Sequence, residues 1–324
     1  MIHNQAHVPV LLDAFMTHIN PRNQIWVDAT YGNGGYSHAI IKSGAAKVIA
    51  LDCDPDAKQR YRALPEFLKE KIVFVPDWFG NLDQNEIVQS YLPVDGIVFD
   101  LGISSIQLND RERGFSFAQS GPLDMRMDNR KGITAADVVN TYSENDLVRL
   151  LIENSEEKHA KRIAKGIVRK RLVEPIKSTT ELAQVVQESI PSGPPKKINP
   201  ATKTFMALRI EVNQELKQLD KGLKAAERAL KPSGIIAAIS FHSLEDRKIK
   251  FFLQPPSKQN RYQPEVNSKE SSFSLINNKP ITATQAELAI NPRSRSAKLR
   301  MARKKELQSN PSDKLLQHPV LNVT

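Results

Sequence analysis

Residues 25–37 have the sequence IWVDATYGNGGYS, and this stretch decides the fold. A short apolar run at 25–29 leads into a glycine-rich turn, and residues 36–42 after it are compatible with a helix. The free backbone N–H groups at the start of such a helix favour a polar or anionic ligand. The stretch therefore predicts a strand, a candidate binding turn and a helix, although a glycine turn alone is also compatible with a plain connection.

Three further apolar runs follow at 48–51, 72–75 and 96–99, and helix-compatible segments at 55–64 and 81–91 lie between them. The runs are too short for helices and rich in Val and Ile, which is typical of buried parallel strands. Alternating strands and helices predict an α/β fold with a doubly wound parallel sheet. Ligands of such sheets bind beyond the carboxyl ends of the strands, so the residues after each run are candidates.

The pattern changes near residue 109 and becomes mainly helical. Helices are predicted at 156–172, at 179–190 behind a Ser178–Glu181 capping box, and at 200–230 as one continuous apolar stripe. Strands are expected again at 235–241 and 296–302. We expect one domain formed by 1–109 and 213–303, interrupted by a mainly helical insertion at 110–212. The composition of 254–292 predicts a long loop typical of disorder, and 304–324 is expected to be a mobile tail.

The composition limits the class of protein. Among 324 residues, 46 Lys and Arg outnumber 36 Asp and Glu, a net charge of +10 that favours nucleic acid as partner. The single cysteine, Cys53, excludes a disulfide framework, and the seven histidines show no metal-ligand spacing, so no metal is expected. No apolar run is long enough for a membrane span, and the first residues lack targeting features. We therefore expect a cytoplasmic protein without a membrane partner, and a homo-oligomer stays open.

Chemically useful side chains follow successive predicted strands. Asp52 can accept the hydroxyls of a ribose, Phe79 can lie against an adenine, and Asp100 ends the fourth run. Taken singly, Asp52 also suits a helix cap and Phe79 a core position. Together they predict a pocket for S-adenosylmethionine, with its amino-acid end at the glycine turn and Asp28. A nicotinamide oxidoreductase is disfavoured, because Ser37 stands where the dinucleotide fingerprint has Gly or Ala.

Several long blocks carry a resemblance to a known family. They are DLGISSIQL at 100–108, RGFSF at 113–117, GPLDMRMD at 121–128, ATKTF at 201–205, SFHSLEDR at 240–247 and NPRSRS at 291–296. The chain resembles the bacterial 16S rRNA (cytosine-N4)-methyltransferase family, RsmH, formerly called MraW. The resemblance implies a class I, Rossmann-like methyltransferase sheet with an inserted helical substrate-recognition domain. It also implies that the cofactor contacts Gly34, Gly35, Tyr36, Asp52, Phe79, Asp100 and Gln107.

The resemblance further implies methyl transfer from S-adenosylmethionine to the exocyclic N4 of a P-site cytidine in the decoding centre of 16S rRNA, within the small ribosomal subunit. The residues agree with this chemistry, because C5 methylation needs a cysteine nucleophile and Cys53 is better explained as a packing residue. Asp100 is a candidate catalytic acceptor for the amine, and equally a ligand for the amino group of the cofactor. His242 is a weaker candidate for holding the base, with a purely structural role as the alternative.

Basic residues supply a hypothesis for RNA binding. Lys158, Arg162, Lys165 and Arg169 recur at spacings of four, three and four on one predicted helix, and Arg293 and Arg295 lie near the end of the chain. Such a face is often merely solvated, but phosphate contacts are favoured beside a base-modifying site. Two other functions stay open: an amino-methyltransferase acting on DNA or another RNA, and a non-catalytic ribosome assembly factor with this fold.

Overall fold

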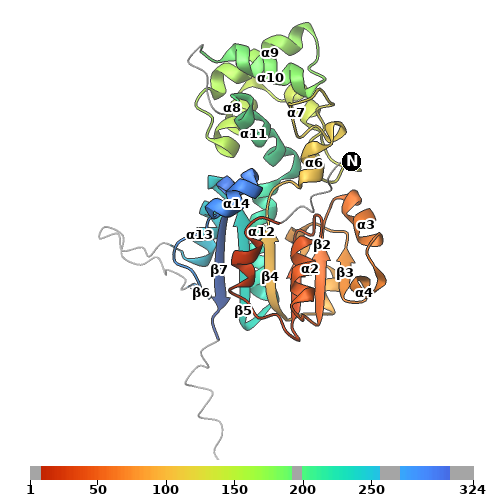
Figure 1. Cartoon of the computed structure of the whole chain (residues 1–324). Helices are drawn as coiled ribbons and strands as arrows, with labels where there is room; N and C mark the ends of the chain where they lie inside the picture. The colour runs from red at the N-terminus through yellow and green to blue at the C-terminus, as the bar shows by residue number, and fades with distance from the viewer. Residues whose placement is uncertain (1–8, 192–198, 256–270, 307–324) are drawn as a thin grey trace, which may run out of the picture.

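The computed structural model describes residues 9–191, 199–255 and 271–306, and they contain a seven-stranded sheet of order β3-β2-β1-β4-β5-β7-β6 (Figure 1). Strands β1 to β5 are parallel, and β7 runs antiparallel to both of its neighbours. The order confirms the predicted α/β class. The bounds of the strands are β1 Ile25–Asp28, β2 Lys47–Leu51, β3 Ile72–Val75, β4 Val94–Asp100, β5 Leu230–Ser240, β6 Phe273–Leu275 and β7 Lys298–Lys304.

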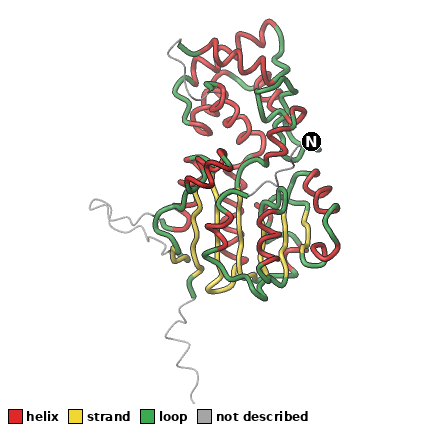
Figure 2. Tube along the Cα trace, viewed as in Figure 1, coloured by secondary structure: helices red, strands yellow, loops and turns green. Residues whose placement is uncertain are grey.

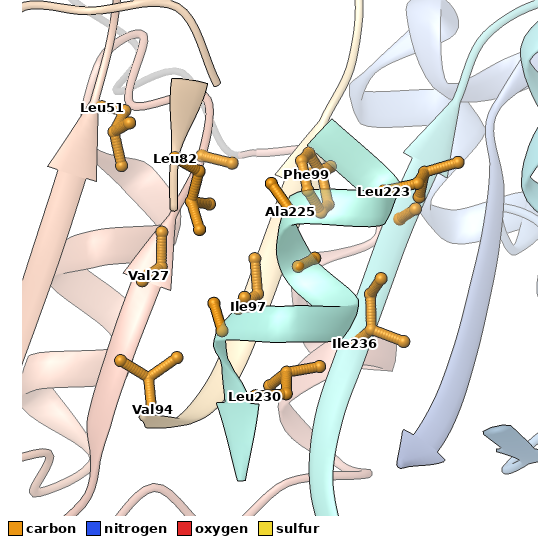
Figure 3. Packing of buried hydrophobic residues seen from close by; sticks show 14 of the residues in the cluster. Val27, Leu51, Leu82, Val94, Ile97, Phe99, Leu223, Ala225, Leu230 and Ile236 are labelled. Carbon is orange, nitrogen blue, oxygen red and sulfur yellow. The ribbon is translucent and has the colours of Figure 1, made fainter. Parts of the chain in front are cut away.

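Alternate residues of each strand enter two different cores, as the period of two requires. Val27, Ile97 and Phe99 pack beneath Leu223 of helix α12 (Glu215–Ala229) on one face (Figure 3). On the opposite face, Trp26 and its neighbours pack against α1 (Leu12–Met16) and α2 (Gly35–Lys42). Burial of both faces explains why the strands are continuous apolar runs rather than alternating ones.

The helices between β4 and α12 form a third core of their own. Its buried side chains extend from Phe115 to Leu208, and Figure 1 shows these helices at the end of the sheet where the parallel strands finish. The Ser178–Glu181 capping box is present as predicted. The bounds are α6 Ser105–Asn109, η2 Arg111–Arg113, α7 Ala135–Thr141, α8 Glu144–Ser155, α9 Ala160–Val173, α10 Thr179–Ser189 and α11 Ala201–Asn213.

The prediction of one helix over 200–230 is wrong, because Gln214 separates α11 from α12 with a left-handed backbone (φ 51°). The neighbouring Asn213 side chain is buried and donates to the Met125 carbonyl at 2.7 Å. Its Oδ1 atom accepts the Met127 N–H, also at 2.7 Å. These long-range hydrogen bonds compete with helix continuation, and the apolar stripe carries no sign of them.

Two other predictions need correction. Residues 81–91 contain only the short α5 (Glu86–Gln89), which follows the 3-10 turn η1 (Phe79–Asn81). The predicted loop over 254–292 includes β6 and α14 (Gln285–Ile290), whereas 256–270 lie outside the described residues, as do 307–324 of the expected tail (Figure 2). The remaining elements are α3 Pro55–Arg62, α4 Glu66–Lys69, α13 Ser243–Leu253 and η3 Pro292–Ser296. Across the described ranges, no helix has the length and apolar character to cross a membrane.

Candidate active site at the carboxyl ends of the strands

A cavity of about 540 Å³ lies where the parallel strands end, beneath the helical insertion. This volume is within the range that holds a cofactor-sized ligand. Six of the seven predicted cofactor contacts line it: Gly35, Tyr36, Asp52, Phe79, Asp100 and Gln107. The seventh, Gly34, is not among the described residues that line the cavity. It is the N-cap of α2.

The glycine turn is shaped by backbone requirements. Gly34 has a φ of 76°, and a Cβ there would lie 2.8 Å from the Tyr31 ring. A Cβ on Gly35 would lie 2.1 Å from Pro9 of the N-terminal segment. The Tyr36 hydroxyl donates to the Val10 carbonyl, so this side chain also anchors the N-terminal segment beside the cavity. The turn therefore leaves its backbone close to any ligand that enters.

Asp28 supports this turn from behind. Its carboxylate accepts hydrogen bonds from the Thr30 N–H and from both the N–H and the hydroxyl of Ser37. It is 1 % exposed and does not line the cavity, so the expected contact between Asp28 and the amino-acid end of the cofactor is not supported. Burial, partly offset by these hydrogen bonds, raises its pKa to about 6.

Asp52 joins the end of β2 to the glycine turn. Its Oδ2 atom accepts the Gly32 N–H at 2.7 Å, and its Oδ1 atom accepts the Asp54 N–H at 2.8 Å. Burial raises the pKa of Asp52 to about 6 in spite of these bonds. Since the carboxylate lines the cavity at a strand end, its remaining lone pairs suit the hydroxyls of a ribose.

Phe79 forms an apolar wall against α12. Its ring meets Phe99 edge-on at 5.7 Å, and a Cβ on Gly222 would lie 2.6 Å from the Phe79 ring. Nearby, Gln218 of α12 lines the cavity, and its buried Oε1 atom has no hydrogen-bond partner within the part of the chain that the structure describes. The wall suits a flat aromatic base, with Gln218 as an acceptor at its edge. Sequence reasoning missed Gln218 because it treated residues 200–230 as one helix with a single buried stripe.

Asp100 has a buried carboxyl oxygen without a partner. Its N–H donates to the Thr30 hydroxyl at 2.7 Å, which fixes the end of β4, but its Oδ1 atom has no hydrogen-bond partner among the described residues. Burial, and then the nearby carboxylates of Asp28 and Glu245, raise the pKa of Asp100 to about 8. A cation in the cavity would stabilise the ionised carboxylate.

Unpartnered polar atoms are concentrated at this cavity. Nine buried side-chain nitrogen or oxygen atoms of the described chain lack a hydrogen-bond partner, and five belong to residues that line it: Tyr31, Asn33, His38, Asp100 and Gln218. Buried polar groups are normally satisfied, because an unmade hydrogen bond costs about 1–3 kcal/mol. The concentration therefore indicates a site prepared for a polar ligand.

Gln107 holds the wall of the cavity rather than offering a free amide. Its Oε1 atom accepts the Ser104 N–H at 2.9 Å, and its Nε2 atom donates to Asp54 at 2.7 Å. Arg113 reaches the same Asp54 carboxylate at 3.1 Å and donates to the carbonyls of Arg126 and Met127. These contacts connect the turn after β2 to the helical insertion.

A second group of side chains lines the cavity near the ends of β4 and β5. It contains Arg209, Glu215, Phe241 and Glu245, none of which was predicted as a site residue. His242, which was predicted, does not line the cavity; its Nδ1 atom accepts the Glu245 N–H at 3.4 Å as the cap of α13. A catalytic role for His242 stays a prediction. The break at Gln214 is what places Arg209 and Glu215 here.

The predicted basic residues lie in two places. Lys158, Arg162, Lys165 and Arg169 are exposed on or just before α9, at the end of the insertion farther from the sheet, and form no ion pair within the described chain (Figure 1). Arg293 is at the cavity and donates to Asn109 at 3.1 Å, whereas Arg295 is exposed on the same η3 turn and does not line the cavity. The described residues show no cluster of metal-ligating side chains.

The sheet order, with an antiparallel β7 and a cavity across the strand ends, is that of the class I, Rossmann-like methyltransferase fold. The sequence profile of the MraW methylase family matches residues 4–305, so the chain belongs to this family. It is 42% identical to the protein named Ribosomal RNA small subunit methyltransferase H from Cereibacter sphaeroides, over 95% of this chain and 93% of the relative. A protein of the same name from Rhodopseudomonas palustris is 44% identical over 97% and 96% of the two chains.

We expect Arg113→Met to lower the free energy of unfolding by about 3–5 kcal/mol, because it leaves the buried Asp54 carboxylate without its cation. Urea unfolding followed by circular dichroism measures the change. Arg111→Met is the matched control, since its ion pair with Glu112 is exposed and is worth at most about 1 kcal/mol. Equal stability losses in the two variants would contradict this account of the buried pair.

Proposed function

We propose that this protein transfers a methyl group from S-adenosylmethionine to the exocyclic N4 of a decoding-centre cytidine in 16S rRNA, within the small ribosomal subunit. Membership of the MraW methylase family and the names of the relatives support a ribosomal RNA methyltransferase. The N4 atom and the decoding centre come from the family resemblance. The observation that carries the proposal is the unpartnered Asp100 carboxyl in the cavity at the end of β4.

The cavity suits the parts of S-adenosylmethionine one by one. Asp52 faces it with lone pairs for the ribose, and the Phe79 wall suits the adenine. The backbone of the turn at Gly35 suits the carboxylate, since it begins a helix. Asp100 suits the positive charge of the ammonium and sulfonium groups, which would offset the cost of its burial.

When bound, S-adenosylmethionine supplies a methyl carbon that is already activated by the sulfonium. In the proposed transfer the lone pair of the N4 amine would form the new N–C bond, the C–S electron pair would stay on sulfur as a thioether, and one proton would pass from N4 to the Asp100 carboxylate or to solvent. The task of the protein is alignment, which contributes up to about 7–11 kcal/mol in favourable cases. In this proposal Asp100 or the backbone carbonyls of 100–104, which line the cavity, would accept the N–H groups of the amine.

The competing C5 reaction needs a cysteine thiolate. Cys53 lines the cavity, but burial, followed by the charges of Asp52, Asp54 and Asp128, raises the pKa of its thiol well above the ordinary value. A thiol held in its neutral form is a poor nucleophile. The site therefore favours the amine over the ring carbon.

Residues 110–212 are proposed to be the substrate-recognition domain, and their separate buried cluster supports this division. A target base inside a helix cannot reach the cavity, so the cytidine must be unpaired or turned outward. The exposed cations of α9 would then hold the phosphates of the surrounding RNA.

The proposed reaction is tested by mass spectrometry of rRNA nucleosides after purified enzyme acts on small subunits from cells that lack the gene. We expect N4-methylcytidine, and no additional 5-methylcytidine. Parallel reactions with naked 16S rRNA and with DNA distinguish the alternative substrates. Cofactor binding without methyl transfer to any of the three would support the non-catalytic assembly factor instead.

Cofactor binding is expected to release a proton at Asp100. At pH 7 a carboxyl whose pKa is about 8 is mostly protonated, and a bound cation favours its ionised form. Binding at pH 7 should therefore release nearly one proton, and affinity should rise with pH through about 8 before it levels off. Calorimetry in buffers of different ionisation enthalpy measures this release.

Asp100→Asn should abolish the proton release and weaken binding. Asp146→Asn, at a half-exposed carboxylate on α8 that does not line the cavity, should leave both unchanged. Proton uptake at pH 7 would contradict the assignment, because it would report the amino group of the ligand rather than Asp100.

The salt dependence of subunit binding tests the basic face of α9. Replacing Lys158, Arg162, Lys165 and Arg169 by Gln should flatten the plot of log affinity against log salt, by about 0.7–0.9 in slope for each phosphate that the variant no longer neutralises. A control with the same charge change replaces Lys42, Lys58, Lys221 and Lys224, which are exposed on helices of the sheet domain. Similar slopes for the two variants would show that α9 makes no special contact with the RNA.

A further inference from the structure

The cavity has a second half that the cofactor does not account for. The glycine turn, Asp52 and Phe79 follow β1, β2 and β3, and the proposed function assigns them, together with Asp100, to the cofactor. The residues near the ends of β4 and β5 are left over, and they include Arg209 and Glu215 from either side of the break at Gln214. Asp100 interacts both with Asp28 behind the glycine turn and with Glu245 of the leftover group, so the leftover half suits a methyl acceptor that meets the donor at Asp100.

Arg209 is held in one orientation. Its Nε atom donates to Glu215 Oε1 at 2.8 Å, and its Nη2 atom donates to Oε2 at 2.9 Å, a bidentate pair with 15% and 9% of the side chains exposed. The remaining nitrogen, Nη1, takes no part in this pair and makes no hydrogen bond to another described residue. The planar guanidinium therefore has one edge fixed on Glu215 and one nitrogen available to a ligand.

The surroundings decide which ligand suits this nitrogen. Glu215 already neutralises the guanidinium, and the buried Glu245 adds a further negative charge that interacts with both Arg209 and Asp100. A phosphate would be repelled by the two carboxylates. A neutral carbonyl oxygen or ring nitrogen would accept the hydrogen bond without this penalty.

We propose that Arg209, positioned by Glu215, donates a hydrogen bond to the acceptor edge of the target cytosine, N3 or O2, and so presents the adjacent N4 amine to the end of β4. This proposal rests on the proposed function and deepens it, because it assigns the base-reading residue. Cytosine places its amine donor beside the N3 and O2 acceptors, whereas uracil presents an N3–H that would oppose the guanidinium. Arg209 thus selects cytosine through N3, because the O2 acceptor is common to both bases.

The test pairs enzyme variants with altered substrates. Small subunits are reconstituted with 16S rRNA that carries cytidine, 3-deazacytidine or 2-thiocytidine at the position which the wild-type enzyme methylates. The wild-type enzyme should show a decrease of about tenfold or more in kcat/KM on at least one analogue, because a charge-assisted hydrogen bond is removed or weakened. Arg209→Met should be slow on cytidine and discriminate less than twofold between cytidine and that analogue.

A structural role alone gives a different result. If Arg209 only connects α11 to α12, Arg209→Met will be slower on every substrate and keep the wild-type discrimination, which would overturn the proposal. Arg209→Lys retains a cation for Glu215 and provides a second, better-folded variant, which should also lose discrimination because it lacks the planar fork. Arg149→Met, at an exposed arginine on α8, is the control and should behave as wild type.

Two further readouts separate this proposal from the proposed function. Affinity for S-adenosylmethionine, measured by calorimetry, should stay within about threefold in the Arg209 variants, because Asp52, Phe79 and Asp100 are unchanged. If the wild-type enzyme methylates no cytidine in the small subunit, the proposed function fails. If it methylates cytidine but the Arg209 variants discriminate as it does, only the role of Arg209 in reading the base is overturned.

Discussion

The loop at residues 125–127 holds the two parts of the molecule together, and the cavity depends on it. The buried Arg113 guanidinium donates to the carbonyls of Arg126 and Met127 while it pairs with Asp54 after β2. From the other side, the Asn213 side chain bonds to the backbone of Met125 and Met127. One short loop thus links the helical insertion both to the turn that carries Asp52 and to the break between α11 and α12.

The geometry of the site follows from these two links. The link through Asp54 sets the wall near the glycine turn, where Gln107 also binds. The link through Asn213 ends α11, so that Arg209 and Glu215 face the cavity instead of continuing along a helix. A cavity between a sheet and an insertion needs such fixed connections, because a shift of about 1 Å in an aligned reaction is costly.

Hydrogen bonding divides the carboxylates into two kinds. The carboxylates of Asp28 and Asp54 accept hydrogen bonds from backbone and side-chain donors of the protein, and both residues are almost fully buried. Asp100 instead has a buried oxygen without a partner, and its pKa is raised to about 8. The first kind, Asp28 and Asp54, maintains the shape of the turn. Burial of the second kind, Asp100, costs free energy until a cation binds beside it. Local stability is thus lower at the site that is expected to bind the charged cofactor.

The sequence by itself determined the sheet and the residues that the strand ends bring to the cavity. Apolar runs and the capping box at Ser178 are local signals, and parallel strands bring residues such as Asp52, Phe79 and Asp100 to one edge whatever the loops do. Only the tertiary structure decided where α11 ends, which way Asp28 faces, and that Arg209 reaches the cavity. These features depend on hydrogen bonds between residues far apart in the chain, such as Asn213 with Met125, and a periodic pattern contains no information about them.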